Sequence, residues 1–389
     1  MLSGMMQTVA EPVINPFRFG GLALDDAFTD REEEIRELER DGLNGQDVVV
    51  FAPRRYGKSS LVWRVAQRLV ARKILVAQVD LMTTPTRERL AAKLAKAIHD
   101  DIASPLFRAR ERLSVFSGLQ ITPTVSIDPD DASVSFSFTA GRDPADLDDT
   151  LERLLGLPGR LAADRGRRAV LVLDEFQKIA DIDAHLPRLM RAVFQQQSDV
   201  AHVYLGSKRH MMERIFSDAQ EPFWRSAKQM ELGVIAPEAF RPYIAERFTQ
   251  TGRRIDDDAL DRVLAITGGH PYGTQELCYW LWEATPARRT ANAERLAAAL
   301  DGVLRSEHAH FTLVWDRASA VQRRLLQALA EEPGRPLSVD YQRRHQLAGT
   351  SSVQKALQAL ERGELVARVD GLVRIVEPFL PEWVRRNVG

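Results

Sequence analysis

Disulfide bonds and membrane spans are the first features that this chain lacks. Its 389 residues include one cysteine, Cys278, so no disulfide can form within the chain, and this residue lies in an apolar helical stretch where we expect it to pack. No apolar run approaches the roughly 18 residues that a membrane-spanning helix needs. Such a chain suits a reducing compartment, and we expect a cytoplasmic protein without a membrane partner.

An excess of charge of one sign is also missing. The chain has 53 basic and 54 acidic residues, which leaves a formal net charge of −1. Whole-chain electrostatics therefore favour neither nucleic acid nor a membrane surface as the partner. No group of histidines and cysteines has metal-ligand spacing, and residues 1–16 lack the basic start and apolar core of a secretory signal. The length is sufficient for two or three domains.

The most informative segment that is present follows the apolar run 48–51 and precedes an amphipathic stretch, 59–72. This strand, loop and helix context suits a phosphate-binding loop, and four residues separate Ala52 from Gly57-Lys58-Ser59, which is the Walker A spacing. Lys58 would reach the β- and γ-phosphates, and the Ser59 hydroxyl would ligate Mg²⁺. We therefore expect ATP or ADP with Mg²⁺. The expected binding residues of the loop are Ala52, Pro53, Arg54, Arg55, Tyr56, Gly57, Lys58, Ser59 and Ser60.

The loop departs from the strict motif at its first position, where Ala52 replaces glycine. Alanine is small enough for close approach but resists a positive φ, so we expect the loop to sit slightly differently. The alternative interpretation is an ordinary basic loop before a helix, and the sequence context and a second motif both argue against it.

That second motif is the apolar run 169–173 followed by Asp174 and Glu175. Such a run suits a strand buried on both faces of a parallel sheet, and α/β sheets place their chemistry at the carboxyl ends of such strands. Asp174 is expected in the Mg²⁺ shell, and Glu175 is expected to orient or deprotonate the attacking water. A buried strand before a solvated acidic turn is the alternative. The pairing with the loop favours ATP hydrolysis.

Short apolar runs that alternate with helical patterns predict an α/β fold with a five-stranded, doubly wound parallel sheet. The expected strands are 47–51, 74–80, 169–173, 202–206 and 231–235, and the helices between them include 86–102, 146–163 and 186–197. Within 119–138, polar and apolar residues alternate around a turn at 128–131. This predicts an inserted β-hairpin, which is either a surface ribbon or a contact surface for another subunit or partner.

Beyond residue 235 the pattern is helical, and the C-terminal tail has its own signature. Helical spacing occurs at 237–251, 257–266, 272–284 and 292–306. In the tail, helices at 319–331, 338–346 and 351–362 precede two short strands, 365–369 and 372–375, which is typical of a winged helix-turn-helix. We divide the chain into a P-loop ATPase domain (1–235), a helical lid domain (236–311) and a winged helix domain (312–389).

With these motifs in place, the chain resembles the archaeal-type ATPases of the STAND class, P-loop NTPases related to the Orc/Cdc6 and AAA+ proteins. The resemblance covers nearly the whole chain. It includes a box at 15–20 and 28–32 that looks like the adenine-side box of that group, both Walker motifs, the strand end 205–209 and the motif Gly268-Gly269-His270-Pro271-Tyr272. It implies an ATPase that acts as a switch, with a helical lid and a winged tail.

The resemblance also implies roles for residues outside the Walker motifs. Ser207 falls at the sensor-1 strand end and would sense hydrolysis of the γ-phosphate, and Lys208 or Arg209 would add charge stabilisation. The expected catalytic set is Lys58, Glu175, Ser207 and Arg209.

Two further positions have both a functional and a structural interpretation. His270 and Pro271 resemble the lid contact to nucleotide, and a helix-capping or packing histidine is the alternative for His270. Arg225 is a candidate arginine finger, and a solvated residue near a strand start is its alternative.

Three functions compete at this point. In the first, a molecular switch, ATP binding closes the lid and slow hydrolysis reopens it, and self-association or a protein partner is left open. The second is ATP-regulated DNA binding through Ser351, Ser352, Gln354, Lys355 and Gln358, which lie off the apolar stripe of the helix 351–362. Residues 316–389 carry only twelve basic against nine acidic side chains, which is little charge for neutralising phosphates. The third, a small-molecule kinase, fits poorly with a water-activating glutamate and a winged tail.

Overall fold

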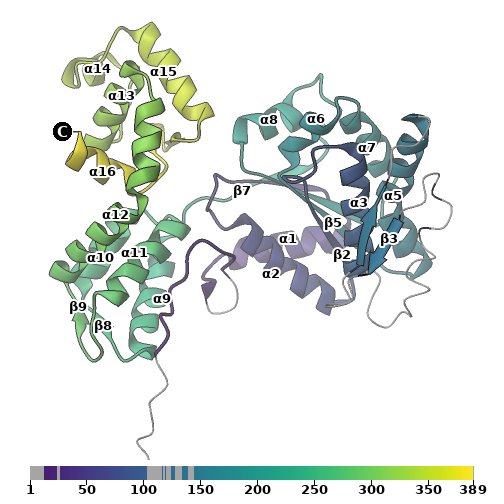
Figure 1. The fold of residues 1–389 in the computed structure, drawn as a ribbon, viewed down its shortest axis with the longest axis horizontal. Coiled ribbons are helices and arrows are strands. Elements are labelled where there is room, and N and C mark those ends of the chain that lie inside the picture. The colour runs from purple at the N-terminus through teal and green to yellow at the C-terminus, as the bar shows by residue number, and fades with distance from the viewer. Residues whose placement is uncertain are drawn as a thin grey trace, which may run out of the picture. The chain divides into compact units, whose positions relative to one another are not determined.

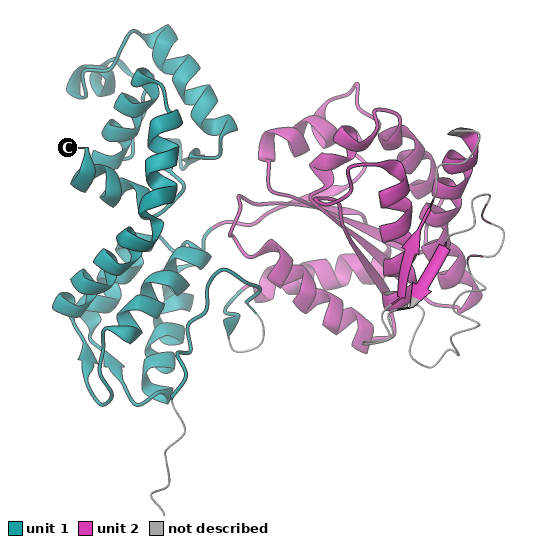
Figure 2. Ribbon diagram, in the orientation of Figure 1, with its two compact units in different colours: residues 1–30, 234–389 teal, residues 31–233 magenta. Residues whose placement is uncertain are grey.

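The computed structural model describes residues 13–23, 27–102, 116, 119, 124–127, 134–138 and 144–388. The chain divides into two compact units (Figure 2). We call residues 31–233 the sheet unit, and residues 1–30 with 234–389 the helical unit. Within the described ranges, no helix combines the length and the apolar character that crossing a membrane would require.

A five-stranded parallel sheet forms the centre of the sheet unit and confirms the predicted fold class. The strand order is β2-β5-β6-β1-β7. All neighbouring strands run parallel. Their carboxyl ends therefore share one edge, and β6 lies between β1 and β5. The strands are β1 (Val48–Phe51), β2 (Leu75–Asp80), β5 (Ala169–Asp174), β6 (Val200–Gly206) and β7 (Lys228–Glu231).

Helices cover both faces of this sheet (Figure 1). On one face, α1 (Glu32–Asn44) and α2 (Lys58–Ala71) pack through Leu38 and Leu69 near Val170 and its even-numbered neighbours. On the other face, α3 (Arg87–Ala97), α5 (Pro144–Asp164) and α7 (Leu186–Phe194) share a core with Leu171 and its odd-numbered neighbours. Burial on both faces explains why the central strands are continuous apolar runs rather than alternating ones.

The fifth strand was predicted in the wrong place, because β7 covers Lys228–Glu231 rather than 231–235. As an edge strand beside β1, it buries only Met230 among its residues, so no apolar run marks it. The apolar residues that follow have other partners. The N–H of Leu232 donates to the Phe51 carbonyl at 2.8 Å, and the N–H of Ile235 donates to the Gly269 carbonyl at 2.9 Å.

The predicted insertion is present as an antiparallel hairpin of β3 (Thr124–Ile127) and β4 (Val134–Ser137). The predicted turn at 128–131 lies outside the described residues. Phe136 is buried, with ring contacts to His99 and Phe116. The hairpin therefore packs on the end of α3, where the α-helix changes at Ile98 into a π-helical turn.

The helical unit contains the predicted helices and one that runs further than expected. They are α9 (Pro237–Gln250), α10 (Asp257–Thr267), α11 (Pro271–Glu283) and α12 (Ala293–Arg317), with a two-residue strand pair of β8 (Arg254–Ile255) and β9 (Thr290–Ala291). α12 was expected to end near 306. Residues 303–317 contain neither proline nor glycine, so the helix continues through the domain boundary that we placed at 311/312.

The C-terminal winged helix is confirmed. It consists of α13 (Ala320–Glu331), α14 (Val339–Arg344), α15 (Thr350–Arg362), β10 (Val366–Val369) and β11 (Leu372–Ile375), followed by α16 (Leu380–Asn387). β10 and β11 pair antiparallel across Asp370 and Gly371, whose φ values of 52° and 75° allow a two-residue turn. Leu325, Val353 and Val373 share its apolar core.

The described part of the N-terminus packs with the helical unit, which differs from our division at 1–235. Phe17 is buried against the rings of Tyr243 and Phe248, at centroid distances of 6.4 and 5.4 Å. The Asn15 amide donates to the Tyr279 carbonyl at 3.2 Å. These contacts join residues that are more than 200 positions apart, so no local pattern could have revealed them.

Candidate active site

The Walker A segment connects β1 to α2 at the carboxyl edge of the sheet, as predicted. Gly57 has φ 85°, and a methyl group added to it would meet nothing within 4 Å, so glycine is needed there for its backbone conformation rather than for space. The N-terminus of α2 has no side-chain cap and no acidic residue in its first turn. Its first N–H groups and the helix dipole therefore suit a bound anion.

Lys58 is the first residue of α2, and its side chain folds back over the loop. It is buried, and its Nζ donates to the carbonyl oxygens of Ala52 at 2.6 Å and Pro53 at 2.9 Å. Ala52 does not have a positive φ, which explains why alanine is tolerated at this position, and Arg55 carries the positive φ of 68° instead. The departure from the strict motif therefore costs the loop no backbone strain at residue 52.

The remaining loop residues differ in exposure. Arg54, Arg55 and Ser59 are exposed, Pro53, Tyr56 and Gly57 are half-buried, and Ser60 is buried. The Ser59 Oγ lies 3.3 Å from Asp174 Oδ2, at the end of β5. The structure therefore brings together the two predicted metal ligands from segments that are 115 positions apart.

The spacing of these two oxygens fits a Mg²⁺ ion. Adjacent ligands in an octahedral shell with metal–oxygen distances of 2.0–2.1 Å lie about 3 Å apart. Among the residues that the structure describes, no three His, Cys, Asp or Glu side chains gather as a metal site. One carboxylate and one hydroxyl suit a Mg²⁺ ion that takes its other ligands from water and phosphate rather than from an all-protein cage.

The electrostatics around Asp174 point the same way. Burial raises the pKa of Asp174, and the negative charges of Glu175 and Asp80 add to the rise, while the Glu175 N–H at 2.8 Å and the Lys58 charge oppose it. Asp80 ends β2 directly opposite Asp174 in the sheet register. A divalent cation would relieve this crowding of carboxylates.

Glu175 is held by a second set of contacts. Its backbone is left-handed, with φ 53°, and its Oε2 accepts a hydrogen bond from Ser207 Oγ at 2.9 Å. Gln177 Nε2 donates to the same oxygen and also lies 3.3 Å from Ser207 Oγ. Ser207 follows β6, which lies between β1 and β5. The predicted sensor residue therefore contacts the predicted water-activating residue directly.

Arg209 stands apart from this cluster. It begins α8 (Arg209–Ser217), its side chain is 58% exposed, and its Nε donates to Glu213 at 2.8 Å. A second nitrogen pairs with Glu231 at the end of β7. The hydrogen bonds to Glu213 and Glu231 raise the pKa of Arg209 above its usual value. The residue is thus held at the carboxyl edge by two acids, and its catalytic role stays a prediction. Lys208 is the residue before the helix.

In the helical unit, His270 and Pro271 begin α11. His270 is buried, and its Nδ1 accepts a hydrogen bond from the Gly273 N–H at 3.1 Å, which is the helix-capping role that we gave as the alternative. Pro271 occupies the first turn of the helix, where its missing N–H is not needed. A contact of either residue with nucleotide stays a prediction.

Arg225, the candidate arginine finger, lies on an exposed loop before β7. Its φ is 49°, and its guanidinium lies 5.4 Å from the centre of the Trp224 ring, which is itself 47% exposed. Phe223, two residues before Arg225, is fully buried and anchors the loop. An arginine and a tryptophan on an anchored loop are consistent with both the solvated role and a role toward a second subunit.

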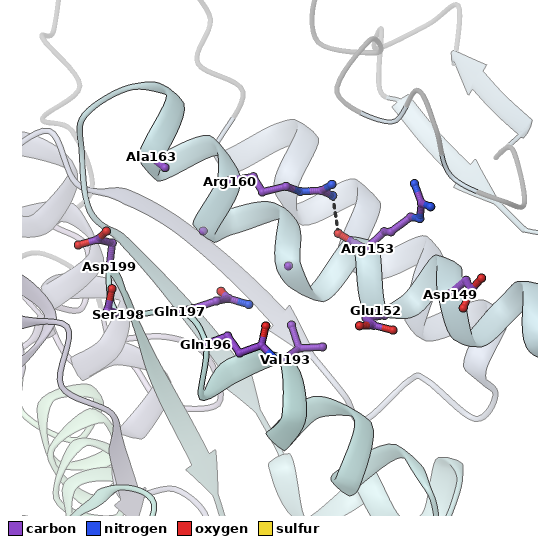
Figure 3. A pocket seen from close by; sticks show the side chains of 12 residues that line it. Asp149, Glu152, Arg153, Arg160, Ala163, Val193, Gln196, Gln197, Ser198 and Asp199 are labelled. Atoms are coloured by element: carbon purple, nitrogen blue, oxygen red, sulfur yellow. Dashed lines mark hydrogen bonds between the residues drawn. The ribbon is translucent and has the colours of Figure 1, made fainter.

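A groove of about 610 Å³ occupies the opposite edge of the sheet (Figure 3). One wall is α5, including Arg153, Gly159 and Arg160, and the other includes Gln197 and Asp199 just before β6. The Arg160 side chain donates to the Arg153 carbonyl at 2.8 Å along the same helix. Because the groove lies at the amino ends of the strands, it is separate from the site built at the carboxyl ends.

Two residues of the site escaped the sequence reasoning. Gln177 follows the second motif by two residues but received no role, because nothing local distinguishes a buried glutamine from a solvated one. Asp80 could have been noticed, since it ends the predicted strand 74–80 with a carboxylate as Asp174 does. Only the sheet order shows that these two strand ends are neighbours.

Comparisons with known proteins agree with this geometry. The family described as "ATPase domain predominantly from Archaea" matches residues 28–277, and "probable winged helix domain" matches residues 309–386. A Walker-type ATPase of Pyrococcus abyssi superimposes with a TM-score of 0.65 at 16% identity, covering 93% of this chain and 97% of that one. The ORC2 protein of Aeropyrum pernix, in ADPNP–ADP complexes, gives 0.53 at 14% identity, covering 95% and 98%. At these identities the likeness concerns the fold. No curated protein matches the chain.

Proposed function

Because the chain belongs to the family of ATPase domains predominantly from Archaea, we propose that it is an ATP-hydrolysing molecular switch of the STAND and AAA+ type. The observation that carries the proposal is the convergence of Ser59, Asp174 and Glu175 with Ser207 at one edge of the sheet. These groups come from the phosphate-binding loop, β5 and the end of β6, and their chemistry is that of nucleoside triphosphate hydrolysis.

In this proposal the loop and α2 bind the phosphates. The backbone N–H groups at the N-terminus of α2 hold the phosphate oxygens, and the Lys58 ammonium exchanges its carbonyl partners for the β- and γ-phosphates. Ser59 and Asp174 would hold Mg²⁺, which would neutralise phosphate charge when bound. Glu175 orients the attacking water and accepts its proton, while Ser207 fixes the carboxylate from β6.

In the proposed switch, the helical unit responds to the bound nucleotide. His270 and Pro271 start α11, and Phe19 of the N-terminal box packs edge-on against Tyr272 and Tyr279 of the same helix. Residues 15–20 of the N-terminal box and the lid motif are therefore packed together within the helical unit. A nucleotide that contacts either would bias the position of both, which is how a lid would report ATP against ADP.

The primary test measures phosphate release from ATP and Mg²⁺ without any added acceptor. The parent protein is expected to turn over slowly, Lys58→Ala to lose nucleotide affinity, and Glu175→Gln to bind ATP but retain it unhydrolysed. Arg72→Ala is the matched control, because Arg72 lies at the other end of α2 and its side chain is 58% exposed where it pairs with Glu39. Hydrolysis by Glu175→Gln at the parent rate would refute the role of Glu175. Phosphate release only with an added small-molecule acceptor would favour a kinase.

DNA binding through the winged helix is the second candidate. It is favoured by the outer face of α15, where Ser351, Ser352, Gln354, Lys355 and Gln358 are all exposed while Val353, Ala356, Leu357 and Leu360 are buried. Exposed polar residues on such a helix can reach phosphates and base edges. Fluorescence anisotropy with duplex DNA, with Lys355→Glu as the variant, tests this. Failure to bind at low salt would reject it.

A further inference from the structure

The glutamine that follows the second Walker motif sits inside the active-site cluster. Gln177 is only 1% exposed. Its Nε2 donates to Glu175 Oε2 and lies 3.3 Å from Ser207 Oγ, and Ser207 Oγ donates to the same Glu175 oxygen at 2.9 Å. The three side chains thus form a closed triangle in which two donors share one carboxylate oxygen.

The backbone keeps Gln177 in this position. It is the middle residue of the 3₁₀ turn η3 (Phe176–Lys178), whose end is fixed by the Lys178 N–H donating to the Glu175 carbonyl at 2.9 Å. The preceding Phe176 is fully buried, and its ring contacts Tyr204 and Phe223 at centroid distances of 4.6 and 5.2 Å. An anchored aromatic on one side and a closed turn on the other leave the amide little freedom to move.

Stability alone does not account for an amide at this place. The Gln177 Oε1 is buried and has no hydrogen-bond partner among the residues that the structure describes. A buried acceptor without a partner is costly, so an apolar side chain of similar length would suit this part of the core better. What the glutamine adds is a donor directed at the carboxylate that is proposed to activate water.

We propose that Gln177 is a positioning residue for Glu175. This inference rests on the ATPase function proposed above. By engaging Oε2 together with Ser207, Gln177 fixes the carboxylate so that the other oxygen, Oε1, is the one that meets the attacking water. A carboxylate held by two donors cannot rotate away from the water, and correct orientation of a general base is a large part of its contribution to the rate.

The test substitutes Gln177→Met, which keeps the length and removes the amide. The kcat for ATP hydrolysis is expected to fall about tenfold or more, since general-base catalysis contributes roughly 10²–10⁴-fold and depends on position. The KM for ATP should stay within about twofold, because no phosphate contact is lost. The melting temperature should change little, because the lost hydrogen bond to Glu175 is offset by removal of the unpaired Oε1. Gln195→Met, at the exposed glutamine that directly follows α7, is the control for the substitution itself.

A double-mutant cycle with Ser207→Ala asks whether both donors act through one carboxylate. If they do, the combined loss in kcat is smaller than the product of the single losses. Gln177→Asn, one methylene shorter but still an amide, serves if Gln177→Met does not fold, and it is expected to lose kcat without losing nucleotide affinity.

Three outcomes overturn the inference. The first is a Gln177→Met enzyme with the parent kcat, and the second is a loss that multiplies independently with Ser207→Ala. The third is a fall in kcat that is accompanied by an equal rise in KM. If the parent protein binds ATP but releases no phosphate, the proposed ATPase function fails first, and that result is distinguishable from a normal parent with an unaffected variant.

Discussion

Replacement of Gly269 by alanine should destabilise the helical unit through a contact that can be measured in the structure. Gly269 has φ +74°, and an added Cβ would lie 2.2 Å from the carbonyl oxygen of Ile235. That carbonyl would have to move by about 0.8 Å to reach 3.0 Å, the shortest distance that real Cβ atoms show. The same residue, Ile235, donates its N–H to the Gly269 carbonyl at 2.9 Å, so the movement would also disturb a backbone hydrogen bond.

Gly268 provides a matched control one residue away. Its φ is +56°, and a Cβ there would meet nothing within 4 Å, so alanine has only a conformational cost of about 1–2 kcal/mol. Gly269→Ala has a similar conformational cost and adds an overpacking cost of about 1–3 kcal/mol. At roughly 2–4 °C for each kcal/mol in a unit of this size, we expect a loss of about 5 °C for Gly268→Ala and about 10 °C for Gly269→Ala.

Thermal unfolding followed by circular dichroism would measure both variants, with ADP affinity determined by calorimetry on the same samples. Equal losses of melting temperature would refute the reasoning, because they would mean that the Ile235 carbonyl is not where the structure places it. The affinity separates the two roles of the motif. If Gly268→Ala stays folded but loses ADP affinity, the lid motif contacts nucleotide as well as capping α11.

The remaining predictions concern the sheet unit. Burial raises the pKa of Asp174 in the folded protein above its value in the unfolded chain. The folded state therefore binds this proton more tightly, and the resulting stabilisation is complete at a pH below the unfolded pKa. It is lost as the pH rises through the folded pKa. Asp174→Asn should therefore melt higher than the parent at pH 7 without Mg²⁺, and this gain in melting temperature should shrink toward pH 3–4. The variant should also lose its Mg²⁺-dependent affinity for nucleotide. A lower melting temperature than the parent at pH 7 would contradict the prediction. Arg209→Ala removes exposed ion pairs worth about 0–1 kcal/mol, so the melting temperature should hardly change. A kcat that is also unchanged would remove Arg209 from the catalytic set. Arg225→Ala should lower kcat only at protein concentrations where subunits associate, which is checked by measuring kcat and the mass in solution over the same range of concentrations. An equal loss of kcat in the dilute monomer would exclude a role of Arg225 in the active site of a second subunit.

The sequence was sufficient to predict those elements in which consecutive residues are buried or in which buried residues recur at a regular spacing. β1 and β5 are buried on both faces, so each reads as an apolar run, and the Walker residues could be assigned because they directly follow those runs. β7 lacks this signal because it buries only Met230. The buried apolar residues that follow it lie in the segment that connects β7 to α9. An edge strand is hard to place for this physical reason.

The candidate site shows the same division between local and long-range information. Ser59 and Asp174 could be paired in advance, because a known chemistry requires both a hydroxyl and a carboxylate near Mg²⁺. Gln177 could not be assigned a role, since its partners Glu175 and Ser207 become neighbours only through the order β5-β6. Arg209 shows the converse, because its motif position suggested catalysis while the structure engages it with surface acids.

The two chain ends of the sheet unit are the strongest case of information that no local pattern contains. The chain enters the sheet unit at Arg31 and leaves it at Gly233, and the buried Arg31 guanidinium donates to the Gly233 carbonyl across 202 positions. Asp30 and Arg31 both have left-handed backbones, with φ of 62° and 69°, a conformation that costs residues other than glycine energy. Such strain persists only where surrounding contacts hold the backbone, and Arg31 makes such a contact with Gly233 at the other end of the sheet unit. The first thirty residues therefore looked like the beginning of the ATPase domain in the sequence, although the described part of them packs with the helices that follow residue 234.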